Sequence, residues 1–356
     1  MSGSKTTWRR VPPSLFGVPF GVAGLSEVWR AAAPVLGISL VISNAVCIAS
    51  ALLWGAVVAG YAASGPRQIM ADLRDPMLAP FVPLATITPM ILAAGLTSYA
   101  LSAARLLVVG FVVITISVGG WLTGQWIVEH LDEGAVHPGY FLPTVAGGLI
   151  GAFAADQVHL HALAYACFGV GMLCWALLGS QLLHRLFFHT ALPAPLVPTL
   201  AIEVAPPVVA GIAYNALSGG ATNIFAYALA GYGVLMVMVQ IRFIPVYARL
   251  RFSPGFWAFT FSFAAVGTDS VEWIAIERPA GAAVYTGLIV AVLSVFIFAI
   301  AARSVVAVRR GQFFPPSIPP TPQPPLVARS DLIPAVRFGA AGSRTHIPTT
   351  TLERKP

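Results

Sequence analysis

Four carboxylates stand in apolar stretches of this sequence, and carboxylates in such surroundings can take up and release protons. They are Glu27, Glu203, Asp269 and Glu272. An ionised side chain in an apolar, membrane-like segment is costly, so each is a functional candidate. Glu203, three residues before Pro206, is the strongest, because burial favours its neutral form. It would either exchange a proton with a passing solute or donate a hydrogen bond to a backbone carbonyl freed by the proline.

The other three carboxylates have simpler explanations. Glu27 precedes Arg30 by three residues, which is ion-pair spacing on one face of a helix. Asp269 and Glu272 are expected near the external end of their segment. Glu203 is therefore the carboxylate that the sequence singles out.

The histidines predict neither a metal site nor a catalytic site. His159 and His161 share a predicted loop with Asp156, but two or three ligands on a flexible loop are weak support for a metal. The sequence has no HExxH motif and no Ser–His–Asp candidate set. We therefore predict no metal, no cofactor and no enzyme activity.

The composition indicates a membrane protein. Of the 356 residues, 57% are apolar and only 9% are charged, whereas soluble proteins carry about 25% charged residues. This leaves too little polar surface to cover a water-soluble globule. We therefore predict an all-α, polytopic membrane protein, and we read the net charge of +7 as a topology signal rather than as a nucleic-acid footprint.

About 20 apolar residues form a helix long enough to span a bilayer, and ten stretches meet this length. They are roughly 15–33, 35–61, 80–101, 105–127, 140–156, 162–183, 196–217, 221–241, 255–275 and 281–302. We predict a cytoplasmic N-terminal segment at 1–13, a membrane domain at 14–306 and a tail at 307–356. The tail contains FFPPSIPPTPQPP, which favours polyproline II, and it is predicted to be disordered and cytoplasmic.

The basic residues predict the orientation. Ten spans place both termini on one side, and only three of the 20 Lys and Arg residues then fall outside: Arg30, Arg105 and Arg278. Because basic residues favour the cytoplasmic side, both termini are predicted to be cytoplasmic, in the cell membrane.

Four prolines repeat along the chain. Pro19, Pro83, Pro143 and Pro206 are separated by 64, 60 and 63 residues, and each falls in an odd-numbered span. Within the bounds predicted above, the even-numbered spans contain no internal proline. The proline pattern changes in the fifth repeat, which begins near residue 255. Irregular backbone at membrane depth is tolerated where it is buried or lines a cavity. We therefore predict five quasi-repeated helical hairpins, with the broken odd helices in an inner ring around a central pore.

Five stretches carry a family resemblance: SLFGVPFGVAGL near the start, HPGYFLPTVAG, APPVVAGIAY, WAFTFSFA and RGQFF. With them the chain resembles, over about residues 12–314, the tellurite-resistance/C4-dicarboxylate transporter family. The bacterial TehA-type members of that family are homologues of plant SLAC1 anion channels. The resemblance implies ten helices as five hairpins, a homotrimer with one pore per subunit, and anions as substrates, including chloride, nitrate, sulfite, dicarboxylates and tellurite.

The resemblance also implies a gate. The family's pore is blocked by a phenylalanine of the ninth span, which corresponds to Phe261, and the glycine opposite it on the first span corresponds to Gly17. Its kinked prolines correspond to the four of the repeat. Alternatively, Phe261 is an ordinary aromatic residue of the core, beside Phe259 and Phe263.

No Lys or Arg falls well inside an odd span, so anion selectivity would rest on helix dipoles and an apolar lining. Two functions stay open. One is a channel for small anions such as chloride and nitrate, gated by Phe261. The other is a proton-coupled carrier or exporter of sulfite, tellurite or C4-dicarboxylates on the same fold, with Glu203 as the coupling group.

Overall fold

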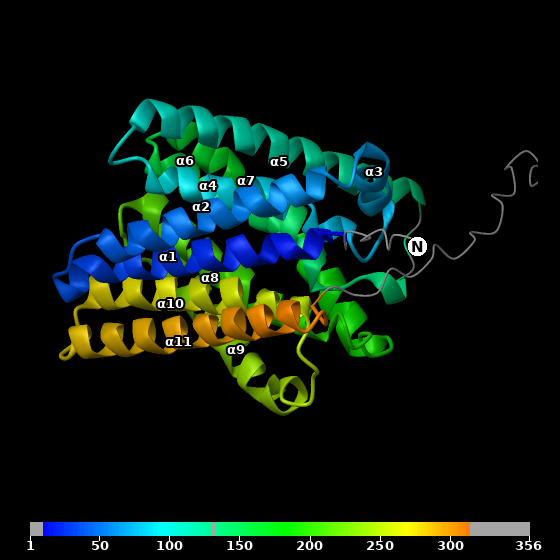
Figure 1. Cartoon of the computed structure of the whole chain (residues 1–356). Helices are drawn as coiled ribbons and strands as arrows, with labels where there is room; N and C mark the ends of the chain where they lie inside the picture. Colours follow the sequence, from blue (N-terminus) through cyan, green and yellow to red (C-terminus); the bar gives the residue numbers. More distant parts are fainter. Residues whose placement is uncertain (1–9, 130, 132, 314–356) are drawn as a thin grey trace, which may run out of the picture. The chain divides into compact units, whose positions relative to one another are not determined.

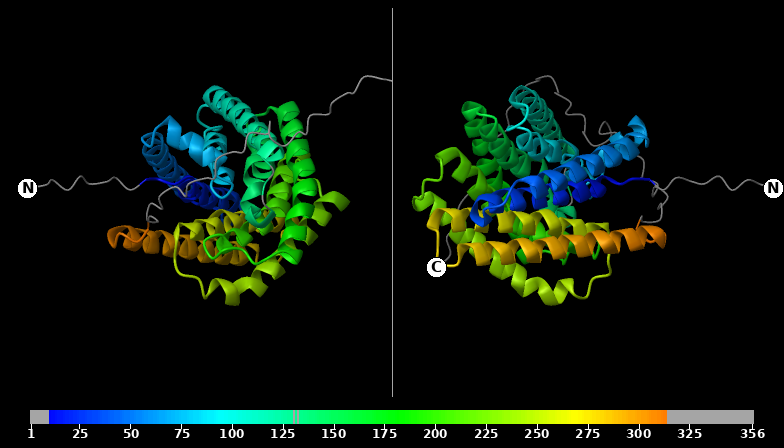
Figure 2. Two further views of the ribbon diagram at one scale, coloured as in Figure 1. Left: turned by 90° about the vertical axis from the view of Figure 1, so that its right-hand side faces the viewer. Right: turned by 60° about the vertical axis from the view of Figure 1, so that its left-hand side comes forward.

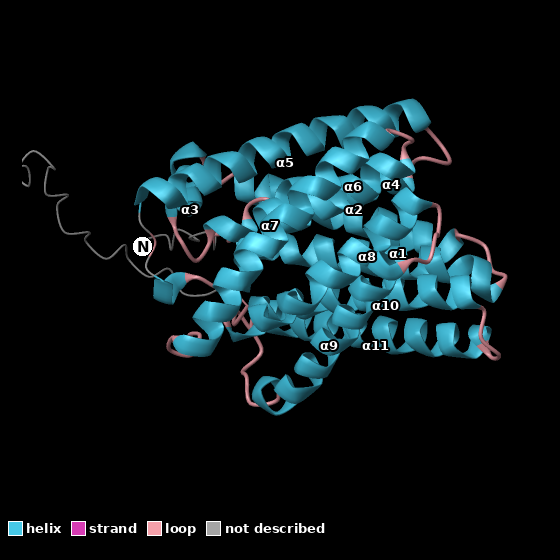
Figure 3. Cartoon of the chain, turned by 180° about the vertical axis from the view of Figure 1, so that it is seen from behind, coloured by secondary structure: helices cyan, strands magenta, loops and turns pink. Residues whose placement is uncertain are grey.

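Every regular element in the described residues is helical, as the composition predicts (Figure 1; Figure 3). The computed structural model describes residues 10–129, 131 and 133–313. Residues 1–9 of the predicted N-terminal segment and 314–356 of the predicted tail lie outside this range.

Five long helices expose apolar side chains along most of their length. In their most apolar windows only 11% to 22% of the residues are buried, and Leu52, Leu106 and Phe298 are more than two-thirds exposed. Continuous apolar surface of this extent indicates contact with lipid. The long helices are α2 (Val41–Ala62), α5 (Leu101–Glu129), α7 (His161–Phe188), α9 (Ile224–Tyr247) and α11 (Ala282–Arg309). Of these, α5 and α9 lie on opposite edges of the bundle in Figure 1 and in both views of Figure 2.

Five shorter helices alternate with the long ones along the chain. They are α1 (Gly17–Leu36), α4 (Leu84–Gly95), α6 (Gly147–Gln157), α8 (Ala205–Ser218) and α10 (Trp257–Glu277). Burial is far higher here, reaching 83% of the most apolar window in Pro138–Gln157 and 67% in Val197–Ser218. The long helices are therefore mostly exposed, whereas the short helices are largely buried inside the bundle.

Each short helix is preceded by a tighter helical segment. A 3-10 helix covers Pro13–Phe16, Ala79–Phe81, Pro138–Phe141, Val197–Val204 and Pro254–Phe256. A π-helix at Leu142–Ala146 follows the third of these. The chain therefore enters each short helix through irregular backbone.

The repeated prolines stand where the irregular backbone gives way to α-helix. Pro19 is the third residue of α1, Pro83 directly precedes α4, Pro143 lies in the π-helix and Pro206 is the second residue of α8. A proline in the first turn breaks no helical hydrogen bond, since that amide has no partner within the helix. The even spans do not all lack proline, because α9 runs on to Tyr247 and contains Pro245.

Among the described residues, seven helical segments are long and apolar enough to cross a membrane. There is an eighth if α3 (Pro66–Arg74) and Ala79–Gly95, between which the chain bends by 110°, count as one span. This multi-pass membrane protein thus has fewer clear spans than the ten predicted. The helices α1 and α10 are not among them, and both carry acidic residues within their length, Glu27 in α1 and Asp269 and Glu272 in α10.

Each short helix packs against the long helix that follows it: α1 against α2, α4 against α5, α6 against α7, α8 against α9 and α10 against α11. The short helices also contact one another in chain order, and α10 returns to pack along α1. Figure 1 shows α1 lying beside α10.

Glycines bring α1 unusually close to α10. A Cβ atom on Gly21 would overlap the side chain of Thr260, and one on Gly24 would lie 3.0 Å from the Cβ of Ala264. Any larger residue at Gly21 would separate the two helices. We call this close contact of Gly17, Gly21 and Gly24 with α10 the glycine seam.

Side chains of the long helices hydrogen-bond to carbonyl groups of the short segments. The Ser50 hydroxyl donates to the Pro19 carbonyl at 2.7 Å, the Trp54 indole to Ala85 at 2.8 Å, and the Gln240 amide to Leu200 at 2.9 Å. A buried polar group without a partner destabilises the fold. These hydrogen bonds therefore connect the long helices to the backbone of the short segments inside the apolar bundle.

Ser50→Ala should lower the free energy of unfolding by about 1 kcal/mol, because it removes the buried hydrogen bond that the Ser50 hydroxyl donates to the Pro19 carbonyl. Thermal unfolding in detergent measures the effect. Ser117→Ala is the matched control, since Ser117 is exposed and bonds only to Val113 of its own helix. Equal losses in the two variants would contradict the role given to Ser50.

Candidate functional site

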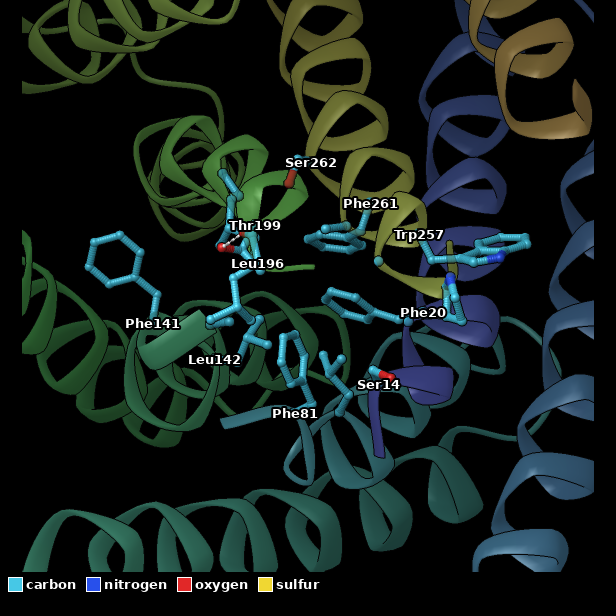
Figure 4. Close-up of a pocket in the computed structure, with 18 of the residues that line it drawn as sticks. Ser14, Phe20, Phe81, Phe141, Leu142, Leu196, Thr199, Trp257, Phe261 and Ser262 are labelled. Carbon is cyan, nitrogen blue, oxygen red and sulfur yellow. Dashed lines mark hydrogen bonds between the residues drawn. The ribbon is translucent and has the colours of Figure 1, made fainter. Parts of the chain in front are cut away.

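A cavity of about 390 Å³ lies where the irregular segments begin their short helices, and we call it the vestibule. All five short segments contribute to its lining (Figure 4). Its labelled lining residues are Ser14, Phe20, Phe81, Phe141, Leu142, Leu196, Thr199, Trp257, Phe261 and Ser262.

The vestibule has an uncharged wall. Among the described residues that line it there is no Lys, Arg, His, Asp or Glu, and its polar groups are few, such as Ser14 and Thr199. The guanidinium carbon of Arg303 lies 5.2 Å from the ring centre of Phe252, a residue at the vestibule. The Arg303 guanidinium therefore contacts a residue of the vestibule lining but is not itself part of that lining.

The amino-terminal ends of the short helices meet at the vestibule. Gly17, Leu84, Ala205 and Trp257 are first residues of α1, α4, α8 and α10, and all four line the cavity. Ala146, also in the lining, directly precedes α6. The amino-terminal end of a helix carries partial positive charge, which would favour an anion at a wall that has no charged side chain.

Two stacked phenylalanine rings line the vestibule. The rings of Phe20 on α1 and Phe261 on α10 stack at a centroid distance of 3.7 Å and an interplanar angle of 16°. Figure 4 shows the two rings facing one another.

A second cavity lies beyond this aromatic pair. It measures about 40 Å³, and we call it the chamber. Phe261 and Val209 line both cavities, so that Phe261 stands between them. Each short helix again contributes: Gly24 and Glu27, Ile91, Ile150 and Phe153, Ile212, and Ala265 and Thr268. The two cavities and the ring between them define a candidate path through the bundle.

The structure does not place Gly17 opposite Phe261. A Cβ atom on Gly17 would lie 3.3 Å from the Cβ of Trp257, and no atom of Phe261 lies within 4 Å of it. The residues of α1 that meet Phe261 are Phe20, through the ring stack, and Gly24, whose added Cβ would lie 3.0 Å from the Phe261 ring. Gly17 lines the vestibule one turn earlier.

The spacing of Phe20, Gly24 and Glu27 could have revealed this face from the sequence. They stand at i, i+4 and i+7, which is one side of a helix, and Phe261, Ala265 and Thr268 repeat the spacing on α10. From the sequence, Glu27 was expected only to pair with Arg30, so its position at the chamber was not predicted.

Glu203 lies outside the candidate path. It is 8% exposed but lines neither the vestibule nor the chamber, while its neighbours Ile202 and Ala205 do line the vestibule. Its Oε1 atom is buried and has no hydrogen-bond partner among the described residues. This oxygen therefore makes no hydrogen bond to a backbone carbonyl freed by a proline.

The other acidic residues of α10 lie at a third, smaller cavity. Asp269 and Glu272 both line it, and the Asn215 amide donates to Glu272 at 2.7 Å. Asp269 is 9% exposed, so its side chain is buried although it lies in the second half of α10.

Residues 10–306 match the family model of SLAC1, voltage-dependent anion channel. The chain belongs to this family. It is similar to a tellurite resistance protein TehA homolog of Haemophilus influenzae, with 26% identity over 322 residues that cover 85% of this chain and 93% of that protein. The resemblance predicted from the sequence motifs is thus confirmed.

Two further relatives share shorter regions. The S-type anion channel SLAH3 of Arabidopsis thaliana is 22% identical over 204 residues, which cover 56% of this chain and 31% of the plant protein. An uncharacterized transporter of Methanocaldococcus jannaschii is 25% identical over 231 residues, which cover 56% of this chain and 65% of that protein.

This SLAC1-family chain also buries a histidine behind the vestibule. His137, one residue before the span Pro138–Gln157, is fully buried and stacks on Phe81 at a ring distance of 5.6 Å. Its Nδ1 accepts a hydrogen bond from the Gly139 amide at 3.1 Å. Burial lowers the pKa of His137 from 6.5 to about 4.

The free energy of unfolding should therefore fall as the pH drops from about 6.5 towards 4. In that range His137 is protonated in the unfolded chain but stays neutral in the folded protein. The loss reaches roughly 3 kcal/mol at the acid end. Thermal unfolding between pH 7.5 and 4.5 measures it. His137→Gln should remove this acid-dependent part, whereas the exposed-site control His161→Gln should keep it. An unchanged pH dependence in His137→Gln would exclude the histidine as its source.

Proposed function

We propose that this chain conducts small anions such as chloride and nitrate across the cell membrane, through the vestibule and the chamber. The observation that carries the proposal is Phe261, which lines both cavities at the centre of a path built by all five short helices. Membership of the SLAC1 family and the names of two relatives, an anion channel and a tellurite resistance protein homolog, support anions as the solute.

The proposed architecture has ten membrane helices in five hairpins. The short helices form an inner ring around the path and the long helices face lipid. The contacts between successive short helices, and the return of α10 to α1, support the ring. In this arrangement α1 and α10 cross the membrane although they carry charged residues, because neighbouring helices bury much of their surface. Both termini are proposed to be cytoplasmic, and the resemblance supports a homotrimer.

The proposed gate is the stacked pair of Phe20 and Phe261. Two rings 3.7 Å apart leave no room for an ion or water between them, so one ring must rotate to join the cavities. An anion then leaves water for an apolar lining, and the amino-terminal ends of five helices offset part of that loss.

Phe261→Ala should raise nitrate flux in proteoliposomes by roughly tenfold or more, which corresponds to about 1.4 kcal/mol off the barrier. Phe263→Ala is the matched control, because it makes the same change two residues along α10 at a position that lines neither cavity. If the two variants behave alike, Phe261 is not the gate.

The competing function is a proton-coupled carrier with Glu203 as its coupling group. Its buried, unpartnered oxygen suits a protonatable group, yet the residue lies off the path. We expect Glu203→Gln to leave anion flux and its pH dependence within about twofold of the native values, since no contact with the solute is lost. Loss of a pH-driven flux would instead favour the carrier.

A further inference from the structure

Glu27 is the single charged side chain among the described residues that line the chamber. It lies on the face of α1 that carries Phe20 and Gly24, seven residues or about two turns beyond Phe20. An anion that has passed Phe261 would therefore next meet a carboxylate.

Arg30 forms an ion pair with this carboxylate from the side away from the chamber. Its Nε donates to Glu27 Oε1 at 3.2 Å, and Arg30 is not among the chamber residues. The guanidinium fits against α4 because residue 95 is glycine: a Cβ there would lie 2.8 Å from Arg30 Nη2. This Nη2 is buried and has no hydrogen-bond partner among the described residues. Packing thus fixes the cation behind the carboxylate.

We infer that Glu27 is a specificity-determining residue that admits monovalent anions to the path and excludes divalent ones. The inference rests on the proposed anion path. Arg30 offsets much of the field of the carboxylate, so the remaining repulsion at the chamber is modest for an ion of charge −1. Coulomb energy is proportional to the charge of the ion, so the same field opposes a divalent anion twice as strongly. The substrate class is accordingly chloride-like or nitrate-like ions, and sulfate and dicarboxylates are rejected.

The charge dependence gives a test that a structural role would not satisfy. Nitrate and sulfate fluxes are measured in proteoliposomes with Phe261→Ala as the parent, so that the aromatic gate does not limit them. Adding Glu27→Gln should raise nitrate flux on the order of tenfold and sulfate flux on the order of a hundredfold, since a free-energy change that doubles squares the factor.

Glu277→Gln in the same parent is the matched control. It removes the same charge from an exposed residue of α10, whose carboxylate accepts a hydrogen bond from Tyr227 at 3.2 Å. This control should leave the ratio of sulfate to nitrate flux unchanged. Should Glu27→Gln alone prevent folding, Glu27→Gln with Arg30→Gln replaces the ion pair by two amides. Its sulfate-to-nitrate ratio should fall between those of the parent and the single variant.

Equal changes in nitrate and sulfate flux, or none, would overturn the inference while the parent still conducts. A parent that does not conduct is a different result, because it overturns the proposed path and the selectivity argument with it. The two failures are thus separated by the parent alone.

Discussion

A backbone carbonyl inside a lipid-embedded bundle must find a donor within the protein, and the rest of this structure depends on that requirement. Pro89 within α4 has no amide to donate to the Ala85 carbonyl four residues earlier, and the Trp54 indole donates to it instead. Ser50, Trp54 and Gln240 of the long helices donate to carbonyls of the short segments. Because these donors come from outside the path, the irregular backbone can surround a cavity without filling it with polar side chains.

For the anion path proposed above, the vestibule has an unusual electrostatic character. Its described lining carries no charged side chain, so any positive potential there would come from helix ends. Partial charges spread over five helices attract an ion weakly and without a fixed geometry. A site of this kind favours passage over tight binding, since a strongly held ion would leave slowly.

Composition and periodicity predicted much of this fold. The shortage of charged residues predicted a multi-pass helical protein, and the spacing of Pro19, Pro83, Pro143 and Pro206 located four of the five irregular segments. The motifs around WAFTFSFA predicted the family. These signals are local, so a single sequence carries them.

The contacts between helices could not be predicted in the same way. The partner of Phe261 depends on how α1 and α10 slide along one another, and Phe20 and Gly24 took the place expected for Gly17. Glu203 was expected on the path because its segment lines it, but the rotation of that segment turns the carboxylate away. The apolar run that predicted the eighth span ends at residue 241, before Arg242, whereas α9 continues to Tyr247.

The glycine seam limits how the proposed gate can move. At Gly21 and Gly24 the helices α1 and α10 are in close contact, so the backbones that carry Phe20 and Phe261 cannot come closer. Separating the two helices would lose this close packing. The scaffold on either side of the rings is therefore stiff, and the available motion is rotation of the rings about their own side-chain bonds. Such rotations in a packed site need only small adjustments of neighbouring atoms. Opening would then rotate side chains while the helices stay in place, so the surface that the protein presents to the surrounding lipid would change little.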